Sequence, residues 1–286
     1  MKKYFYLAVA LVAVSACDVI KNPTDPSTPA PSADQVNYTA VGASDAIGWG
    51  GTVYCLPFTA CPDGTGYVPV TARRFEANQK TVTLMNLGIP GAVLSPQIQA
   101  IGAQVGSDIF GNFLDQEMPF VPKNSTLVTI FAGGNDANTI GKAVDHGLGG
   151  SDPNGYIASQ TQAFGRDMLA LINGIKGRAA SARIVVLNLP NLAGLPYASG
   201  LTLTQKRGLQ QIAVGFSSQI NALGAQGVLV LDLMCDSRFY QPSSLSSDGF
   251  HPNDTGYAYL SDLVYAAASS GTVTPPRASC SQMGLY

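Results

Sequence analysis

The chain has 286 residues, and 46% of them are hydrophobic, so it is long and apolar enough to bury a sizeable core. Its 16 Lys and Arg residues against 18 Asp and Glu residues give a formal net charge of −2, and no basic block is present that could follow a phosphate backbone. The composition therefore excludes disorder of the whole chain and argues against nucleic acid as a partner.

Residues 1–16 have the features of a signal peptide. Lys2 and Lys3 precede an apolar run over residues 4–14, which is too short to span a bilayer as an ordinary transmembrane helix. Val14-Ser15-Ala16-Cys17 resembles the bacterial lipobox, in which the cysteine receives a diacylglyceryl group. We expect Cys17 to carry the lipid of an exported, membrane-anchored lipoprotein that faces the periplasm or the cell exterior. Ordinary signal cleavage, with this cysteine left as a free thiol, is the alternative.

Residues 17–35 are predicted to be a tether. Pro23, Pro26, Pro29 and Pro31 lie there among Ser, Thr and Asp, a composition that has little to bury. The folded domain is therefore expected to be a single domain over residues 36–286.

The remaining cysteines indicate disulfides. Without Cys17 they form an even set in a compartment that permits disulfides. Sequence proximity favours Cys55 with Cys61, which leaves Cys235 to tie the C-terminal tail through Cys280, although three pairings are possible. No metal site is expected, because paired CxxC spacing is absent and the chain has only two histidines.

The hydrophobic pattern predicts an α/β fold. Short apolar runs that are typical of buried strands occupy residues 36–41, 81–87, 126–131, 183–189 and 228–233. Apolar residues at helical spacing occupy residues 94–114, 157–175, 204–223 and 254–268. We expect a three-layer α/β/α sandwich with a five-stranded parallel sheet, and a disulfide-stapled loop over residues 54–67. In such sheets the working groups collect at the carboxyl ends of the strands.

Four polar motifs follow predicted strands in chain order. They are Gly42-Ala43-Ser44-Asp45, Gly88-Ile89-Pro90-Gly91, Gly133-Gly134-Asn135-Asp136 and Asp248-Gly249-Phe250-His251-Pro252-Asn253. From about Val36 to Ala268 this ordered set resembles the SGNH (GDSL-like) hydrolase family, whose four blocks supply a Ser, a Gly, an Asn and an Asp-x-x-His pair. The resemblance implies the flavodoxin-like fold of that family. One departure is Ala43, where Asp is usual, with Asp45 following the serine.

The chemistry of these residue types supports a catalytic interpretation. A serine hydroxyl such as that of Ser44 needs a base, and His251 is the candidate. Asp248, three residues earlier, can accept the other imidazole N–H and so orient the ring. The resemblance implies an oxyanion hole formed by the backbone N–H groups of Ser44 and Gly91 and by the side-chain amide of Asn135.

Each motif also has a purely structural interpretation. Ser44 could cap a helix, Gly91 could serve only a turn, and residues 133–136 could be a turn with a helix cap. His251 could be a core or helix-entry residue, whereas His146 is expected in a surface loop among glycines. Four motifs in order, each after a predicted strand, favour the catalytic interpretation.

The sequence therefore predicts a serine ester hydrolase of esterase or lipase type that works through an acyl-enzyme on Ser44. We expect no cofactor, a monomer, and a small ester, a lipid or an acylated carbohydrate as substrate. The alternatives are an acyltransferase or carbohydrate deacetylase, and a non-catalytic surface binding protein on the same fold. The intact set of side chains argues against the binding protein, and no G-x-S-x-G nucleophile elbow occurs.

Overall fold

The computed structural model describes residues 32–59 and 61–286, and these belong to one compact unit. The predicted signal peptide (residues 1–16), the predicted lipid-attachment residue Cys17 and most of the predicted tether (residues 17–35) lie outside the described residues.

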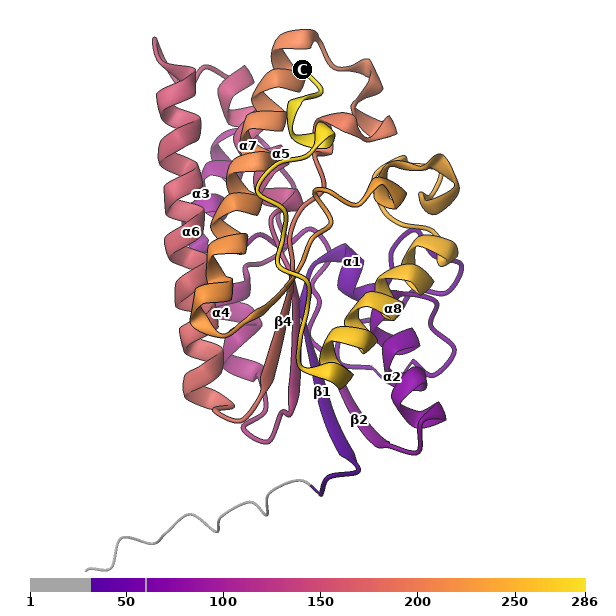
Figure 1. The fold of residues 1–286 in the computed structure, drawn as a ribbon. Helices are drawn as coiled ribbons and strands as arrows, with labels where there is room; N and C mark the ends of the chain where they lie inside the picture. Colours follow the sequence, from indigo (N-terminus) through magenta and orange to yellow (C-terminus); the bar gives the residue numbers. More distant parts are fainter. Residues whose placement is uncertain (1–31, 60) are drawn as a thin grey trace, which may run out of the picture. The chain divides into compact units, whose positions relative to one another are not determined.

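A five-stranded parallel sheet forms the centre of the domain (Figure 1). Its strands lie in the order β2-β1-β3-β4-β5, and their bounds are β1 Gln35–Gly42, β2 Thr81–Asn86, β3 Leu127–Phe131, β4 Arg183–Leu187 and β5 Leu229–Leu231. All five predicted strands are present, most of them with shorter bounds than expected. The first crossover places β2 on one side of β1, and the second crossover places β3 on the other side. A topological switch point therefore lies between β1 and β3. Ligands of open α/β sheets bind at such a point.

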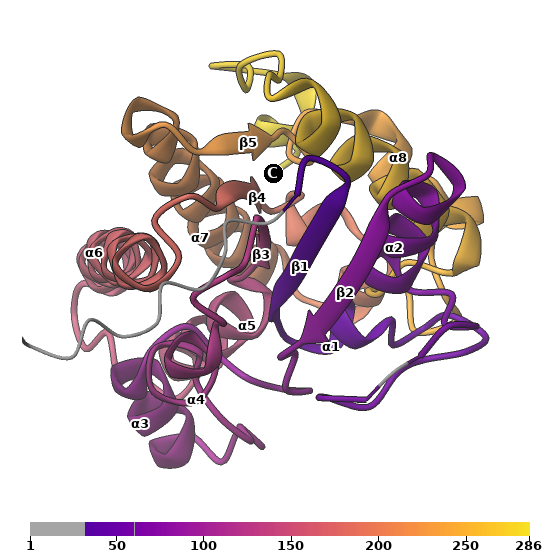
Figure 2. The ribbon, with the colours of Figure 1, turned by 90° about the horizontal axis from the view of Figure 1, so that it is seen from below.

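Helices cover both faces of the sheet, as the view along the strands shows (Figure 2). Helices α2 (Tyr67–Ala77) and α8 (Asp254–Ser270) pack together on one face. The other face carries α3 (Pro96–Gln104), α5 (Gly134–Asp145), α6 (Pro153–Arg178) and α7 (Leu203–Ala222), with the short α4 (Phe113–Gln116) beside them. The single-turn helix α1 (Ser44–Ile47) follows β1 directly. The predicted α/β/α sandwich is confirmed.

The alternation of side chains along the strands explains why the strand sequences are almost continuously apolar. On β3, Val128 and Ile130 join the core that lies beneath α6 and α7, whereas Leu127 joins the core beneath α2 and α8. A parallel sheet buried on both faces needs apolar residues on both, because successive side chains point to opposite sides. Stacked rings of Phe164 and Phe216, 3.8 Å apart between centroids, join α6 to α7.

Local signals set where the long helices begin. The Thr202 side chain and Gln205 form a capping box at the start of α7. The Asn253 side chain accepts the backbone N–H of Gly256 and so caps α8, immediately after the predicted histidine motif. Asn253 therefore joins the loop that carries His251 to a helix that is fixed against the sheet.

The predicted helix over residues 94–114 is wrong as a single element. Helix α3 ends at Gln104, and a loop leads to α4, which begins at Phe113. Gly106 adopts a left-handed conformation (φ +64), and the N–H of Ser107 donates back to the carbonyl of Gly102, which closes the end of α3. Helices α2 and α5 were not predicted from the hydrophobic pattern.

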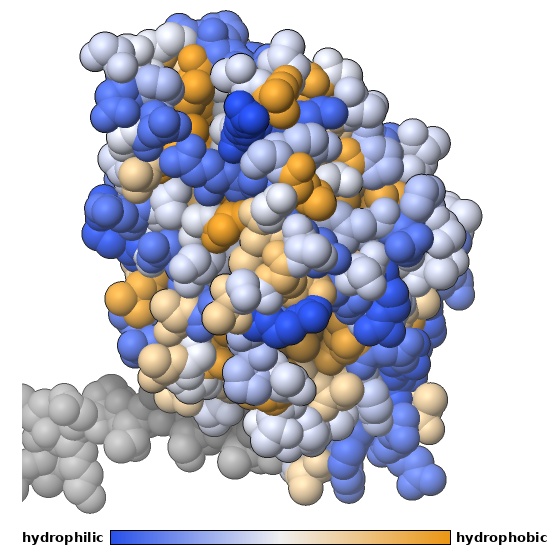
Figure 3. Space-filling model, turned by 45° about the horizontal axis from the view of Figure 1, so that its top comes forward, coloured by the Kyte–Doolittle hydropathy of each residue, from blue (hydrophilic) through white to orange (hydrophobic). Residues whose placement is uncertain are grey.

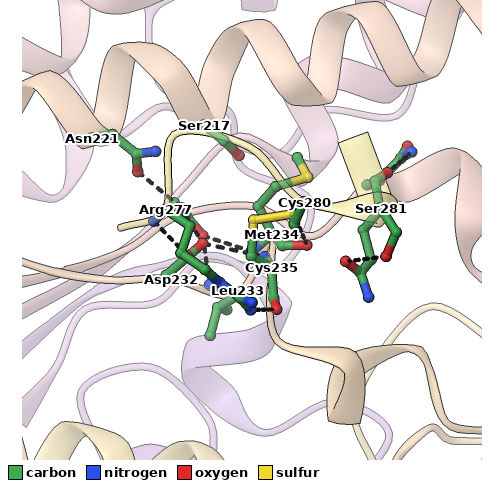
Figure 4. Close-up of a disulfide and its surroundings, with 12 residues drawn as sticks. Ser217, Asn221, Asp232, Leu233, Met234, Cys235, Arg277, Cys280 and Ser281 are labelled. Atoms are coloured by element: carbon green, nitrogen blue, oxygen red, sulfur yellow. Dashed lines mark hydrogen bonds and ion pairs between the residues drawn. A yellow bond between two sulfur atoms is a disulfide. The ribbon is translucent and has the colours of Figure 1, made fainter. Parts of the chain in front are cut away.

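Both predicted disulfides are present. Cys55 pairs with Cys61, and Cys235 pairs with Cys280, each pair with 5.7 Å between Cα atoms. The tail that follows α8 runs back toward the carboxyl edge of the sheet (Figure 1), and the second disulfide fixes it beside the end of β5 (Figure 4). The backbone N–H of Arg277 also donates to Asp232, 3.0 Å away. Among the helices of the described part, none has the length and apolarity that a membrane span requires.

Candidate active site

The nucleophile candidate lies at the switch point of the sheet. Ser44 is the first residue of α1, directly after β1, and only 8% of its surface is exposed. The cap position of α1 is Ala43, and no side chain caps this helix. The structural interpretation of Ser44 as a helix cap is therefore wrong, and its hydroxyl is free to bond elsewhere.

Ser44, His251 and Asp248 form one hydrogen-bonded series. The Ser44 hydroxyl lies 2.8 Å from Nε2 of His251, and Nδ1 of His251 lies 2.7 Å from Oδ2 of Asp248. Because an ionised carboxylate can only accept, Nδ1 carries the proton in the neutral ring and Nε2 accepts from the serine. The structure thus joins residues that are 207 positions apart in the sequence.

The loop around Asp248 keeps this carboxylate ionised. Partial burial alone would raise its pKa, but hydrogen bonds from the His251 side chain and from the backbone N–H groups of Phe250 and His251 outweigh burial. The hydroxyl of Ser246 donates to the same carboxylate at 2.8 Å. Together these contacts lower the pKa of Asp248 to about 2. The carboxylate is therefore charged throughout the neutral range.

Contacts within its own loop fix the His251 ring. Gly249 adopts a left-handed conformation (φ +69), and a Cβ there would collide with the backbone of Tyr197. The Phe250 ring meets the imidazole edge to face at 4.8 Å and meets the Tyr197 ring in the same way. Only 14% of the His251 side chain is exposed, whereas His146 lies exposed in the turn that ends α5. Of the two histidines, only His251 contacts the site.

Asn135 and Gly91 lie on the loops that follow β3 and β2. The Asn135 side chain is in the first turn of α5 and donates one amide hydrogen to the carbonyl of Ala92 at 2.9 Å. Its second amide hydrogen has no acceptor among the described residues, and Asn135 and Ser44 line the same cavity. Gly91 has φ +72, and the described residues provide no hydrogen-bond acceptor for its N–H. Ala92, not Gly91, lines this cavity.

Two supporting residues received no role from the sequence. Asn86 bridges two motifs, because its amide donates to the carbonyl of Ala46 at 2.7 Å and its oxygen accepts the N–H of Gly88 at 3.0 Å. Asp136 is buried and accepts the N–H of Leu94 at 2.8 Å; its burial raises its pKa to about 7. Asp136 is the last residue of the Gly133-Gly134-Asn135-Asp136 motif and could have been identified from it, whereas no local sequence pattern distinguishes Asn86.

Asp45 lies close to the Ser44 series. Burial raises the pKa of its carboxyl, the imidazole of His251 lowers it and the carboxylate of Asp248 raises it, with a net increase.

An apolar cavity of about 40 Å³ opens beside Ser44. Its walls come mostly from residues that follow β3 and β4 and from the histidine loop, including Phe131, Leu189, Leu192, Leu195 and Phe250. Figure 3 turns the top of Figure 1 forward, and apolar side chains are exposed there among hydrophilic ones. The cavity offers an apolar place for part of a substrate next to a polar reacting group.

No cluster of three or more His, Cys, Asp or Glu side chains suited to a metal ion occurs within residues 32–59 and 61–286. The polar groups of the site are those of serine, histidine, carboxylate and amide side chains and of the backbone.

A flavodoxin-like parallel sheet with a serine, a histidine and a carboxylate in series at its switch point defines the class of α/β ester hydrolases. The model of the GDSL-like Lipase/Acylhydrolase family matches residues 40–259. The chain therefore belongs to this family, whose members are hydrolases that act on ester bonds. No curated protein matches the chain.

Solved structures with the same fold come from several bacteria and from a metagenome. The lipase Lip_vut3 from a goat rumen metagenome has a TM-score of 0.55 at 17% identity, with 81% of this chain and 97% of that chain covered. Phospholipase A1 from Streptomyces albidoflavus NA297 has a TM-score of 0.55 at 18% identity, with 83% and 99% covered. A variant of an acetyl xylan esterase from Geobacillus stearothermophilus has a TM-score of 0.51 at 14% identity, with 84% and 96% covered. These likenesses show the fold.

Proposed function

We propose that this protein hydrolyses carboxylic esters through an acyl-enzyme on Ser44. The observation that carries the proposal is the unbroken series from the Ser44 hydroxyl through His251 to Asp248, with distances of 2.8 and 2.7 Å. A binding protein would need no base beside a serine and no carboxylate behind that base. The series is therefore more specific to catalysis than the fold is.

The first half of the reaction forms the acyl-enzyme. Nε2 of His251 takes the hydroxyl proton as the Ser44 oxygen attacks the ester carbonyl, and Asp248 stabilises the imidazolium. The carbonyl oxygen becomes an oxyanion, toward which the Asn135 amide and the N–H groups of Ser44 and Gly91 would donate. The tetrahedral intermediate collapses, His251 gives its proton to the departing alcohol, and the acyl group stays on Ser44.

The second half releases the acid. A water molecule gives a proton to Nε2 of His251 and attacks the acyl carbonyl, and the proton then returns to the Ser44 oxygen as the bond to the acyl group breaks. Asp248 holds the same imidazole tautomer in both halves, because its pKa of about 2 keeps it ionised.

The cavity beside Ser44 suits the alkyl part of an acyl group. Its apolar walls include Leu189, Leu192 and Leu195 and lie next to the reacting hydroxyl. Acyl transfer to an alcohol other than water uses the same acyl-enzyme and is separated from hydrolysis by product analysis.

We further propose that the protein is exported, anchored through a lipid on Cys17, and monomeric. The lipobox-like sequence that ends at Cys17 and the two disulfides support an oxidising compartment outside the cytoplasm. Labelling of the full chain with a radioactive fatty acid in a bacterial host, compared with Cys17→Ala, tests the anchor. Sedimentation of the purified protein tests the monomer.

The deciding experiment compares hydrolysis of p-nitrophenyl acetate by the protein, by Ser44→Ala and by a matched control, Ser159→Ala. Ser159 is an exposed residue of α6 and bonds only to a carbonyl of its own helix. We expect Ser44→Ala to lose at least about 10³-fold in kcat, because nucleophile and base act as a unit, and the control to keep its activity. Full activity in Ser44→Ala, or none in the folded parent protein, would refute the proposal.

A further inference from the structure

A carboxyl group that no cationic side chain of the described residues contacts is buried close to the end of β1. It belongs to Glu117, which follows α4, and none of its surface is exposed. Its Oε2 accepts the backbone N–H of Gly42 at 2.8 Å. Its other oxygen, Oε1, has no partner among the described residues.

Gly42 and Ile89 belong to the two segments that carry site residues. Gly42 ends β1 and lies two residues before Ser44, and Ile89 lies two residues before Gly91. The N–H of Ile89 donates to the carbonyl of Gly42 at 3.1 Å. The Glu117 side chain therefore holds Gly42, and the carbonyl of Gly42 holds Ile89. Gly42 and Ile89 each lie two residues before a predicted site residue.

Burial of this carboxyl has an energetic cost. Removal from water raises the pKa of Glu117 well above its usual value, although the backbone N–H of Gly42 opposes this shift. An apolar residue of similar size would avoid that cost but would leave the buried N–H of Gly42 without its acceptor. The role of Glu117 in its surroundings is therefore that of a hydrogen-bond acceptor.

Glu117 also contacts the loop in which the first motif departs from the family pattern, at Ala43. Ala43 has no polar side chain with which to support the loop around Ser44, where an Asp is usual in the family that the sequence resembles. The contact from Glu117 to Gly42 comes from 75 residues further along the chain and reaches the same loop.

We propose that Glu117 is a positioning residue, which fixes the Ser44 loop against the Gly91 loop by accepting the N–H of Gly42, whose carbonyl in turn accepts the N–H of Ile89. It contacts no reacting atom and acts only through these two backbone segments. The inference rests on the proposed acyl-enzyme at Ser44. Displacement of a reacting group by about 1 Å can reduce a rate 10²-fold, so a loosened junction is expected to slow turnover more than substrate binding.

The test compares Glu117→Gln, Glu117→Ala and Glu117→Leu with the parent protein in the hydrolysis of p-nitrophenyl acetate. Gln116→Ala is the matched control, since Gln116 is the exposed neighbour on α4 and its side chain bonds only within its own loop, to the N–H of Asn112. Near-UV circular dichroism establishes that each variant is folded. Ser44→Ala, measured alongside, reports separately on the proposed function.

We expect Glu117→Ala and Glu117→Leu to lose about 10–100-fold in kcat with KM within about two-fold of the parent, on the scale that misplaced groups cost. Glu117→Gln keeps an acceptor oxygen and is expected to stay within about three-fold of the parent. Equal kcat in a folded Glu117→Leu and the parent would overturn the inference, as would an equal loss in Glu117→Gln and Glu117→Leu. If Glu117→Ala does not fold, the comparison of Glu117→Gln with Glu117→Leu decides whether the inference holds.

Discussion

At the scale of single residues, Asp248 shows how one short loop controls a charge. Four hydrogen-bond donors surround its carboxylate: the imidazole, two backbone N–H groups and the Ser246 hydroxyl. All of them favour the ionised form, which partial burial alone would disfavour. The same contacts that orient His251 for proton transfer therefore also couple Asp248 to the stability of the fold.

The pH dependence of unfolding is expected to reveal this coupling. The pKa of Asp248 is lowered to about 2 in the folded protein, so the stabilisation is complete above the usual Asp pKa of about 4 and is lost as the pH falls toward 2. We expect urea unfolding to show the parent protein more stable than Asp248→Asn at pH 6, with the difference shrinking between pH 4 and 2. A difference that stays constant over that range would contradict the assignment.

The same variant is expected to lower kcat by about 10⁴-fold, because an amide no longer fixes the tautomer of the imidazole. Near-parental kcat in Asp248→Asn would show that the ring is oriented by other contacts, such as the edge of Phe250.

The short motifs were sufficient to identify candidate site residues from the sequence. Ser44, Asn135 and the Asp248–His251 pair each follow a strand, and the geometry brings Ser44, His251 and Asp248 together. Glu117 could not be predicted in this way. Its partner is a backbone group 75 residues earlier, and backbone hydrogen bonding to a distant side chain leaves no local pattern in the sequence.

At the scale of elements, the strands were easier to predict than the helices. Strands of a doubly covered sheet are short apolar runs and stand out from their surroundings. The segment over residues 94–114 has helical spacing throughout, yet Gly106 and the contacts of the following loop divide it into α3 and α4. Helix α5 begins inside the Gly133–Asp136 motif. The polar residues of this motif interrupt the helical spacing of apolar residues, so the pattern did not predict the helix.

The two disulfides are expected to contribute unequally to stability. Loop-closure entropy predicts about 4 kcal/mol for the Cys235–Cys280 pair, whose residues are 45 positions apart, and about 2 kcal/mol for Cys55–Cys61, which are 6 apart. Urea unfolding of the Cys235→Ala/Cys280→Ala and Cys55→Ala/Cys61→Ala double variants measures both. A larger loss from the shorter loop would show that strain or residual structure dominates over loop length.

At the scale of the whole molecule, the substrate range depends on how the loops after β3 and β4 enclose the small cavity beside Ser44. These loops come from different parts of the chain, so the size of the cavity could not be predicted from sequence patterns. Its apolar walls include Leu192, whose side chain is almost completely buried.

We expect the apolar walls of this cavity to determine which p-nitrophenyl esters are the better substrates, because they lie beside the reacting serine. Leu192→Ala enlarges the cavity and is expected to shift the optimum toward longer acyl chains, whereas Leu260→Ala, in the opposite core beneath α8, removes a similar buried side chain without changing the preference. Measured kcat/KM across the ester series checks this. An unchanged optimum in Leu192→Ala would place the acyl chain elsewhere.

Strand β1 separates the start of the domain from the edge of the sheet that carries Ser44. It has eight residues, and at about 3.3 Å for each residue it separates Gln35 from the switch-point edge by about 26 Å. If the domain is attached through its N-terminal end, the attachment and the site therefore lie at opposite ends of β1. Immobilisation on a bead or display on a cell through that end would leave the mouth of the cavity open to polymers or particles too large to pass beneath the protein.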